Sequence, residues 1–169
     1  DRDGVINVDK GYVHTIENFN WILGSKDAIK YLNNNNHYVF VATNQSGIAR
    51  GYYTESEMHD LHSFMDRELK KVGAYVDAYF YSPYHPDFLN EYKHLSHLRK
   101  PNTGMLEMAE KEWNFDKSKS FLIGDKSTDI ECAKNYGIKG FLFNGGGFKK
   151  VPAGFVKDDA AKSVTNHDR

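Results

Sequence analysis

The chain has 169 residues, which is the length of a single domain. Its 22 Lys and Arg residues balance 23 Asp and Glu residues to a net charge of −1, which excludes the basic footprint of a typical nucleic-acid-binding protein. The 40% hydrophobic content suits a globular domain, no apolar run is long enough to cross a membrane, and one cysteine, Cys132, fits a reducing compartment, so we expect a cytoplasmic protein.

Hydrophobic periodicity and turn residues predict alternating helices and strands after an N-terminal loop over 1–23. Thr54 and Glu57 have the spacing of a capping box, and the helix that they open ends before Gly73. We expect, in chain order, a helix over 25–32, a strand over 37–42, a helix over 54–72, a strand over 76–81, a polar loop over 82–100, a helix over 103–113, a strand over 121–123, a helix over 128–136, a strand over 140–143 and a short last strand over 155–156.

This order predicts an α/β fold, a parallel sheet with helices on both faces, in one domain over residues 1–169. In such sheets, ligands bind beyond the carboxyl ends of the strands. Polar side chains follow the expected strands at that edge: Thr43 after one strand, Lys100 after the loop of the next, and Asp125 and Asp129 after a third.

Asp1 and Asp3 form an Asp-x-Asp motif, which by itself is a weak signal. Together with Asp125 they would repel one another unless a divalent cation lay among them, and hard oxygen ligands favour Mg²⁺. Thr43 and Lys100 offer a hydroxyl and a compact cation, so the set would seat a phosphate between metal and ammonium. One carboxylate could then act as a covalent nucleophile and another as acid and base.

Four motifs stand in this order: DRDGV over 1–5, ATNQ over 42–45, RKP over 99–101 and IGDKSTD over 123–129. With them the chain resembles the phosphatases of the haloacid-dehalogenase (HAD) superfamily. The resemblance implies a three-layer, Rossmann-like fold. The segments between the motifs are too short for a separate cap domain, so we expect an open site.

The resemblance is narrower than the superfamily: over about residues 1–143 the chain resembles the D-glycero-D-manno-heptose 1,7-bisphosphate phosphatases and their histidinol-phosphate phosphatase relatives. The stretches that carry it are DRDGVINVDKGYVHTIENF, TNQSGIARGYYTE and RKPNTGM. It implies Mg²⁺-dependent hydrolysis of the C7 phosphate through an aspartyl-phosphate, in nucleotide-heptose synthesis for surface polysaccharide such as lipopolysaccharide. It also implies Asp1 as nucleophile, Asp3 as acid and base, and Thr43 and Lys100 as phosphate ligands. Asp1, the main-chain carbonyl of Asp3, and Asp125 would hold Mg²⁺, and Asp129 would orient Lys100 or the metal's water.

The same resemblance implies the substrate contacts. The expected residues are Asp9, Lys10, Gly11, Tyr12, Asn44, Gln45, Ser46, Arg99 and Lys126. Arg99 and Lys126 are available for a second phosphate, Arg50 is a weaker candidate, and Tyr12 and His14 would line the sugar site or simply pack the loop. The expected partner is a small phosphorylated sugar, with no nucleic acid or membrane, and the protein is expected to be a monomer.

Two other functions stay open. Histidinol-phosphate hydrolysis would need an acid for the substrate's ammonium, for which Asp9 and Glu17 are the nearby candidates. A catalytically silent phosphosugar-binding module is the alternative of another class, although such relatives usually lack a carboxylate or the lysine that this chain retains.

The chain departs from the family pattern where many members hold a structural zinc in the loop before Arg99. The corresponding positions are Ser82, Tyr84, Ser96 and Leu98, none of which is a usable zinc ligand, so no zinc is expected. A rearranged site of His85, His94 and His97 is the alternative. Without zinc, we expect aromatic packing to hold the loop, with Tyr81, Tyr84, Phe88 and Tyr92 as candidates.

The family's first strand, which ends at the nucleophile, has no counterpart before Asp1. We expect that the biological chain carries an upstream strand of about five residues.

Overall fold

The computed structural model describes residues 1–88 and 90–148, so the expected strand over 155–156 lies outside the described residues. Helices and strands alternate, and each strand begins within three residues of its expected position. The elements are α1 (Ser25–Asn34), β1 (Phe40–Asn44), α2 (Glu55–Lys70), β2 (Ala78–Ser82), η1 (Asn90–Leu98), α3 (Gly104–Glu112), η2 (Lys117–Lys119), β3 (Phe121–Gly124), α4 (Ser127–Tyr136) and β4 (Lys139–Leu142).

The described strands form two parallel pairs. β1 pairs with β2, with Thr43 opposite Tyr81, and β3 pairs with β4, with Phe121 opposite Lys139. Parallel pairing confirms the expected α/β fold, because strands that are joined through helices return in the same direction.

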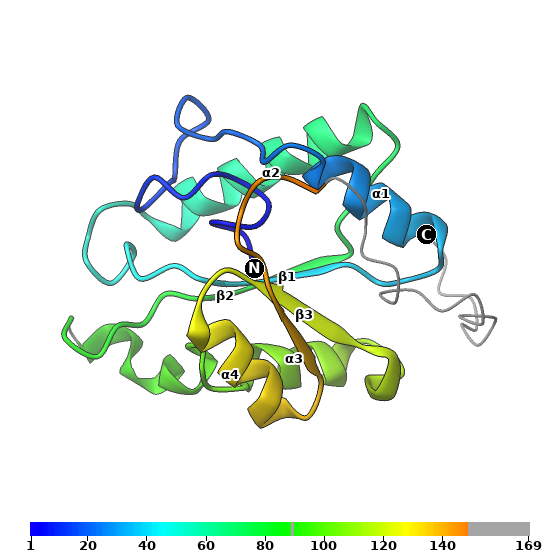
Figure 1. Ribbon diagram of the computed structural model, residues 1–169. Coiled ribbons are helices and arrows are strands. Elements are labelled where there is room, and N and C mark those ends of the chain that lie inside the picture. The colour runs from blue at the N-terminus through cyan, green and yellow to red at the C-terminus, as the bar shows by residue number, and fades with distance from the viewer. Residues whose placement is uncertain (89, 149–169) are drawn as a thin grey trace.

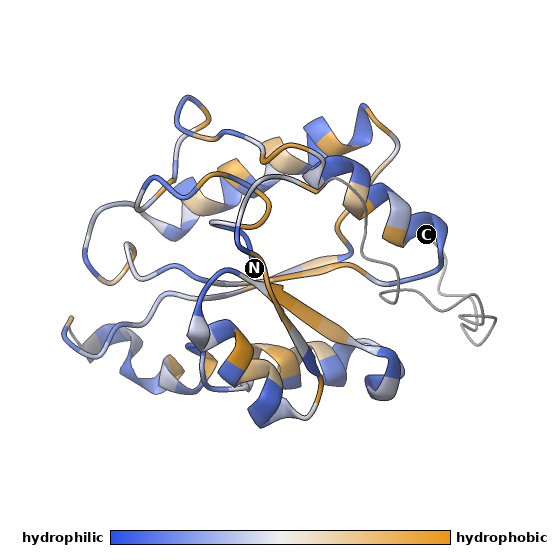
Figure 2. Cartoon of the chain, viewed as in Figure 1, coloured by the Kyte–Doolittle hydropathy of each residue, from blue (hydrophilic) through white to orange (hydrophobic). Residues whose placement is uncertain are grey.

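Helices cover both faces of the strands (Figure 1): α1 and α2 lie on one side, and α3 and α4 lie on the other. On the first side, Val41 of β1 packs against Ile29, Leu61 and Met65. On the second side, Ala42 and Phe80 pack against Met105 and Ala109 of α3. Figure 2 shows hydrophobic strands between helices whose residues alternate in hydropathy, as expected for a three-layer arrangement.

The capping box expected at the start of α2 is confirmed. Glu57 N donates to Thr54 Oγ1 over 3.1 Å, and Thr54 N donates to Glu57 Oε2 over 2.7 Å. Met58 and Met65 of this helix are fully buried. Gly73 follows the helix with a φ of 74°, a left-handed conformation that favours glycine.

The loop expected over 82–100 contains a helix that the sequence analysis missed. η1 is a 3₁₀ helix, and its three-residue period brings Leu95 and Leu98 to the cluster that α3 also contacts. Tyr92 and Tyr81 pack against a second cluster around Tyr53. The expected aromatic support of this loop is therefore present for these two tyrosines.

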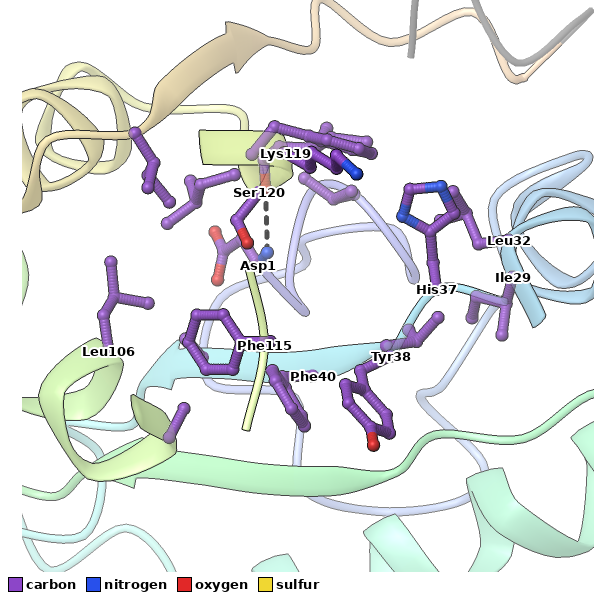
Figure 3. A pocket seen from close by; sticks show the side chains of 18 of the residues that line it. Asp1, Ile29, Leu32, His37, Tyr38, Phe40, Leu106, Phe115, Lys119 and Ser120 are labelled. Atoms are coloured by element: carbon purple, nitrogen blue, oxygen red, sulfur yellow. Dashed lines mark hydrogen bonds between the residues drawn. The ribbon is translucent and has the colours of Figure 1, made fainter. Parts of the chain in front are cut away.

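An apolar cavity of about 300 Å³ lies between β1 and β3. Figure 3 shows its walls, which include Ile29 and Leu32 of α1, Phe40 of β1, and Leu106 and Phe115 from the opposite side. Asp1 is one of the residues that line the cavity, and its main-chain nitrogen donates to the carbonyl of Ile123 over 2.8 Å. The cavity therefore lies between the two strand pairs, and its lining includes the residue that the sequence analysis assigns to the chemistry.

Met65→Ala tests whether the packing of α2 against the strands contributes to the free energy of unfolding. Because Met65 is 0% exposed, we expect its truncation to lower the free energy of unfolding by about 2–5 kcal/mol. Leu23 is 82% exposed, and Leu23→Ala should change the value by less than about 0.5 kcal/mol. Urea denaturation of both variants measures the difference, and equal losses would contradict this packing.

Candidate active site

The motif residues meet at one edge of the strands, near the N-terminus marked in Figure 1. Thr43 belongs to β1, Asp125 follows β3, and Asp129 lies in the first turn of α4. Lys100 follows η1 and bonds to both Asp1 and Asp129. The structure thus brings together residues that are up to 128 positions apart in the sequence.

Lys100 is the centre of this cluster. Its ammonium donates to Asp1 Oδ1 over 3.0 Å, to the carbonyl of Ala42 over 2.9 Å and to Asp129 Oδ1 over 2.5 Å. The residue is only 3% exposed. Burial lowers the pKa of Lys100, and the carboxylate of Asp129 opposes that change. Three acceptors therefore hold a desolvated cation in one place.

The backbone of Lys100 is also held by hydrogen bonds. Asn44 donates from Nδ2 to the carbonyl of Lys100 over 3.1 Å, and the Lys100 N–H donates to Asn44 Oδ1 over 3.0 Å. Asn44 is a predicted substrate contact. Its amide ties the end of β1 to the residue after η1, which sets the direction of the lysine.

Three carboxylates lie close enough to share a cation. Oxygen atoms of Asp1, Asp125 and Asp129 all lie within 4.8 Å of one another, and among the described residues this is the one such group of histidine, cysteine or acidic side chains. Both oxygens of Asp129 are already bonded, one to Lys100 and the other to the Lys126 N–H over 3.1 Å. Asp125 Oδ1 is buried and has no hydrogen-bond partner.

Asp125 has the properties of an oxygen ligand for a cation. Burial raises the pKa of its carboxyl, with Lys126 opposing and the charge of Asp129 adding to the rise. Glycine at position 4 leaves room for the Asp125 side chain, because a Cβ on Gly4 would lie 2.1 Å from Asp125 Oδ2. An unpartnered carboxylate oxygen beside a second carboxylate suits a hard divalent cation such as Mg²⁺.

Arg2 and Gln45 hold the second acid of the motif. Asp3 Oδ1 accepts from Asn7 Nδ2 over 2.9 Å, and Asp3 Oδ2 accepts from Gln45 Nε2 over 2.9 Å. Arg2, which is fully buried, donates to both oxygens of Asp3 over 3.1 Å. The same Gln45 amide donates to Thr43 Oγ1 over 2.8 Å, so one side chain links Asp3 to Thr43.

Gln45 was expected to contact substrate, but it is 2% exposed. Its carbonyl oxygen accepts from the hydroxyl of Tyr53, whose pKa is raised by burial. Its position fits a residue that orients other groups. Sequence reasoning missed Arg2 and Tyr53 in this network, although an arginine between two motif acids is a residue that would need several partners once buried.

His62 lies beside the guanidinium of Arg2. Its Nε2 lies 3.2 Å from Arg2 NH1, and its ring stacks on Tyr79. Burial and then the nearby Arg2 lower the pKa of His62 to about 3. The imidazole is therefore neutral at physiological pH and can accept a hydrogen bond from the guanidinium.

The remaining expected contacts lie in exposed loops. Lys126 donates to Asp9 Oδ2 over 3.1 Å, and the Gly11 N–H donates to Asp9 Oδ1 over 2.9 Å. Lys10 bonds to Asn20 in the same loop. Tyr12 is exposed and Ser46 is half-buried, and neither joins the cluster around Lys100. Arg99 is half-buried and donates to the carbonyl of Tyr84 over 3.2 Å.

Two of the four positions that the sequence analysis compared with zinc ligands are buried. Ser82 is fully buried, and Leu98 packs in the cluster with Met105. The alternative set of His85, His94 and His97 does not form a metal-binding group among the described residues.

Comparison with known proteins agrees with the geometry of the site. The HAD-hydrolase-like family model matches residues 97–166. The D-glycero-beta-D-manno-heptose-1,7-bisphosphate 7-phosphatase of Rhodopseudomonas palustris is 44% identical over 146 residues, which are 86% of this chain and 81% of that protein. The chain belongs to this family of HAD phosphatases. It is therefore a phosphoric monoester hydrolase by family.

Two further relatives of this phosphatase family agree. The Escherichia coli K12 protein of the same name is 42% identical over 142 residues, covering 82% of this chain and 74% of that protein. The solved D,D-heptose 1.7-bisphosphate phosphatase from B. bronchiseptica, complexed with magnesium and phosphate, is 32% identical with a TM-score of 0.74, covering 83% of this chain and 76% of that chain.

No helix within residues 1–88 and 90–148 combines the length and hydropathy that a membrane span requires.

Gln45→Glu tests the positioning network of this phosphatase. The change keeps the shape of the side chain but replaces the Nε2 donor with an oxygen that faces Asp3 and Thr43. We expect phosphate release to fall about 10- to 100-fold, because hydrogen bonds to charged groups contribute roughly 1.5–3 kcal/mol.

The control is Asn34→Asp, the same chemical change at an exposed position of α1, which should leave turnover unchanged. Steady-state kinetics with circular dichroism separates a misplaced acid from an unfolded protein. Full activity of folded Gln45→Glu would contradict the positioning role.

Proposed function

We propose that this chain removes the C7 phosphate of D-glycero-D-manno-heptose 1,7-bisphosphate, with Mg²⁺ as cofactor, in nucleotide-heptose synthesis for surface polysaccharide. The observation that carries the proposal is the buried Lys100 ammonium between the Asp1 and Asp129 carboxylates, beside the unpartnered oxygen of Asp125. The 40–44% identity to relatives that bear this substrate in their names supports the choice of sugar.

In the proposed reaction Asp1 is the nucleophile. The Arg2 N–H and the Lys100 ammonium both donate to Asp1 Oδ1, over 2.8 and 3.0 Å, which orients the other oxygen for attack on phosphorus. As the Asp1–phosphorus bond forms, the bond from phosphorus to the C7 oxygen breaks, and Asp3 protonates the leaving alkoxide. Water then attacks phosphorus in the aspartyl-phosphate and loses a proton to Asp3. The bond from phosphorus to the Asp1 oxygen breaks, which releases inorganic phosphate and restores the Asp1 carboxylate.

Thr43 and Lys100 would hold the equatorial oxygens of the transferring group, where negative charge is spread. Asp1, the main-chain carbonyl of Asp3, and Asp125 would hold Mg²⁺, which would supply further positive charge for the transferring phosphoryl group. Asp129 would position Lys100, in keeping with its two bonded oxygens. Loop residues 9–12, Arg99 and Lys126 would contact the rest of the sugar, and the enzyme would act as a monomer.

Histidinol phosphate is the second substrate to test. Its ammonium would need a carboxylate, for which Asp9 and Glu17 are the candidates. Asp9 pairs with Lys126 over 3.1 Å, which leaves Asp9 less available to an ammonium of the substrate.

The first experiment measures phosphate release with Mg²⁺ from both anomers of the heptose bisphosphate and from histidinol phosphate. We expect one phosphate per heptose bisphosphate, loss of activity with EDTA, and loss by at least about 10³-fold in Asp1→Asn, because the nucleophile is removed.

Release from histidinol phosphate alone would keep the chemistry and overturn the substrate. Equal inertness of the wild type and of Asp1→Asn on all three esters would contradict the proposed function and favour a phosphosugar-binding module.

We also propose that the cavity between β1 and β3 receives a strand that precedes Asp1. The apolar walls and the bond from the Asp1 nitrogen to Ile123 O support this, because a parallel strand placed there would join both strand pairs and bury its side chains on two faces. Intact mass and N-terminal sequencing of the natural protein test it. A natural chain that starts at Asp1 would contradict it.

A further inference from the structure

The guanidinium of Arg2 contacts two different parts of the molecule through its two terminal nitrogens. Its NH2 group lies 3.1 Å from both carboxylate oxygens of Asp3 and donates to the carbonyl of Val13 over 2.6 Å. Its NH1 group lies beside α2, 3.2 Å from Nε2 of His62. Within the described part of the chain, His62 is the one hydrogen-bond partner of NH1. Because a planar group that is bonded at two corners has a fixed orientation, the bond to His62 sets how Arg2 meets Asp3.

The hydrogen bond between Arg2 and His62 has a defined direction. Arginine is a donor only, so His62 Nε2 accepts, and the proton of the neutral ring is then on Nδ1. Burial, followed by the charges of Arg2 and His59, lowers the pKa of His62, which keeps the ring neutral. An imidazolium would offer no acceptor and would place a second buried cation beside the guanidinium. The contact therefore requires the neutral ring.

The imidazole of His62 is itself held in place. It is 4% exposed, and it stacks on the ring of Tyr79, with centroids 4.3 Å apart and planes at 14°. Tyr79 belongs to β2, and its hydroxyl donates over 2.8 Å to Oδ1 of Asp66, which lies one turn along α2 from His62. Because Tyr79 covers the face of the ring, the edge that carries Nε2 remains for Arg2. α2 and β2 together thus supply a rigid acceptor for the guanidinium.

We propose that His62 is a positioning residue for the acid of the reaction. It acts through Arg2, whose guanidinium contacts Asp3 and whose main-chain N–H donates to Asp1 Oδ1 over 2.8 Å. Without an acceptor at NH1, the guanidinium can turn toward another partner, and the Asp3 carboxyl then loses a donor that fixes its direction. The inference rests on the proposed function, in which Asp3 protonates the leaving alkoxide.

The test compares two leaving groups. An alkoxide needs a proton from Asp3 in order to leave, whereas p-nitrophenolate leaves without one. His62→Leu keeps most of the bulk of the side chain but removes the acceptor. In this variant, kcat/KM for the heptose bisphosphate should fall about 10-fold, while kcat/KM for p-nitrophenyl phosphate stays within about twofold. A distorted site would lower both values together, because kcat/KM reports on the steps up to the loss of the leaving group.

Two further variants control for structural effects. His62→Gln should restore most of the lost activity on the bisphosphate, because its amide oxygen offers an uncharged acceptor in place of Nε2. His59→Leu, the same change one turn earlier on the exposed face of α2, should alter neither value. No loss in His62→Leu, an equal loss on both esters, or a His62→Gln variant no better than His62→Leu would overturn the inference.

Asp3→Asn separates this inference from the proposed function. Selective loss on the bisphosphate in Asp3→Asn but not in His62→Leu would reject the inference alone. An Asp3→Asn variant without that selectivity would reject both. If the wild type hydrolyses histidinol phosphate in place of the bisphosphate, the proposed substrate is wrong, and the same comparison is made with that alkyl ester.

A measurement without turnover tests the contact directly. In the wild type, the ¹⁵N ring resonances of His62 should show a neutral ring with its proton on Nδ1 between about pH 5 and 8. A proton on Nε2, or an imidazolium in that range, would overturn the inference whatever the substrate, because Nε2 would then be unable to accept from Arg2.

Discussion

The buried ammonium of Lys100 is the constraint on which the active-site edge depends. An isolated charge in the protein interior is costly, so Lys100 must be surrounded by acceptors of fixed position. Those acceptors come from the N-terminal residue, from β1 and from α4. Satisfying one lysine therefore draws three distant segments together and aligns the Asp1 carboxylate with them.

A second buried cation organises the other half of the site. Arg2 and the Gln45 amide together hold Asp3 and Thr43, and Tyr53 holds Gln45 in turn. Buried polar networks of this kind favour one arrangement, because a shift would leave further buried groups without a partner. The side chains that hold the acid of the proposed reaction thus differ from the ammonium of Lys100 that holds its nucleophile, and Arg2 contacts both acids, through its N–H and its guanidinium.

Charge compensation differs between two cations at the rim. Lys126 is neutralised by Asp9 and helps to join the N-terminal loop to the start of α4. Arg50 is oriented by aromatic rings and lacks a carboxylate partner among the described residues. A cation that is held in place but not neutralised is the kind of group that binds an anionic ligand.

The sequence by itself determined the alternation of elements, the cap at Thr54, and the order of the motifs at the strand ends, because these depend on local periodicity and on residue types at short spacing. It did not reveal η1, the separation of the strands into two pairs, or the partners of Gln45, Asn44 and Lys126. Only the tertiary structure decided those, since each depends on which side chains meet after distant loops have closed. A motif names the groups available for chemistry, and burial and hydrogen bonding determine which of them face the substrate and which position the others.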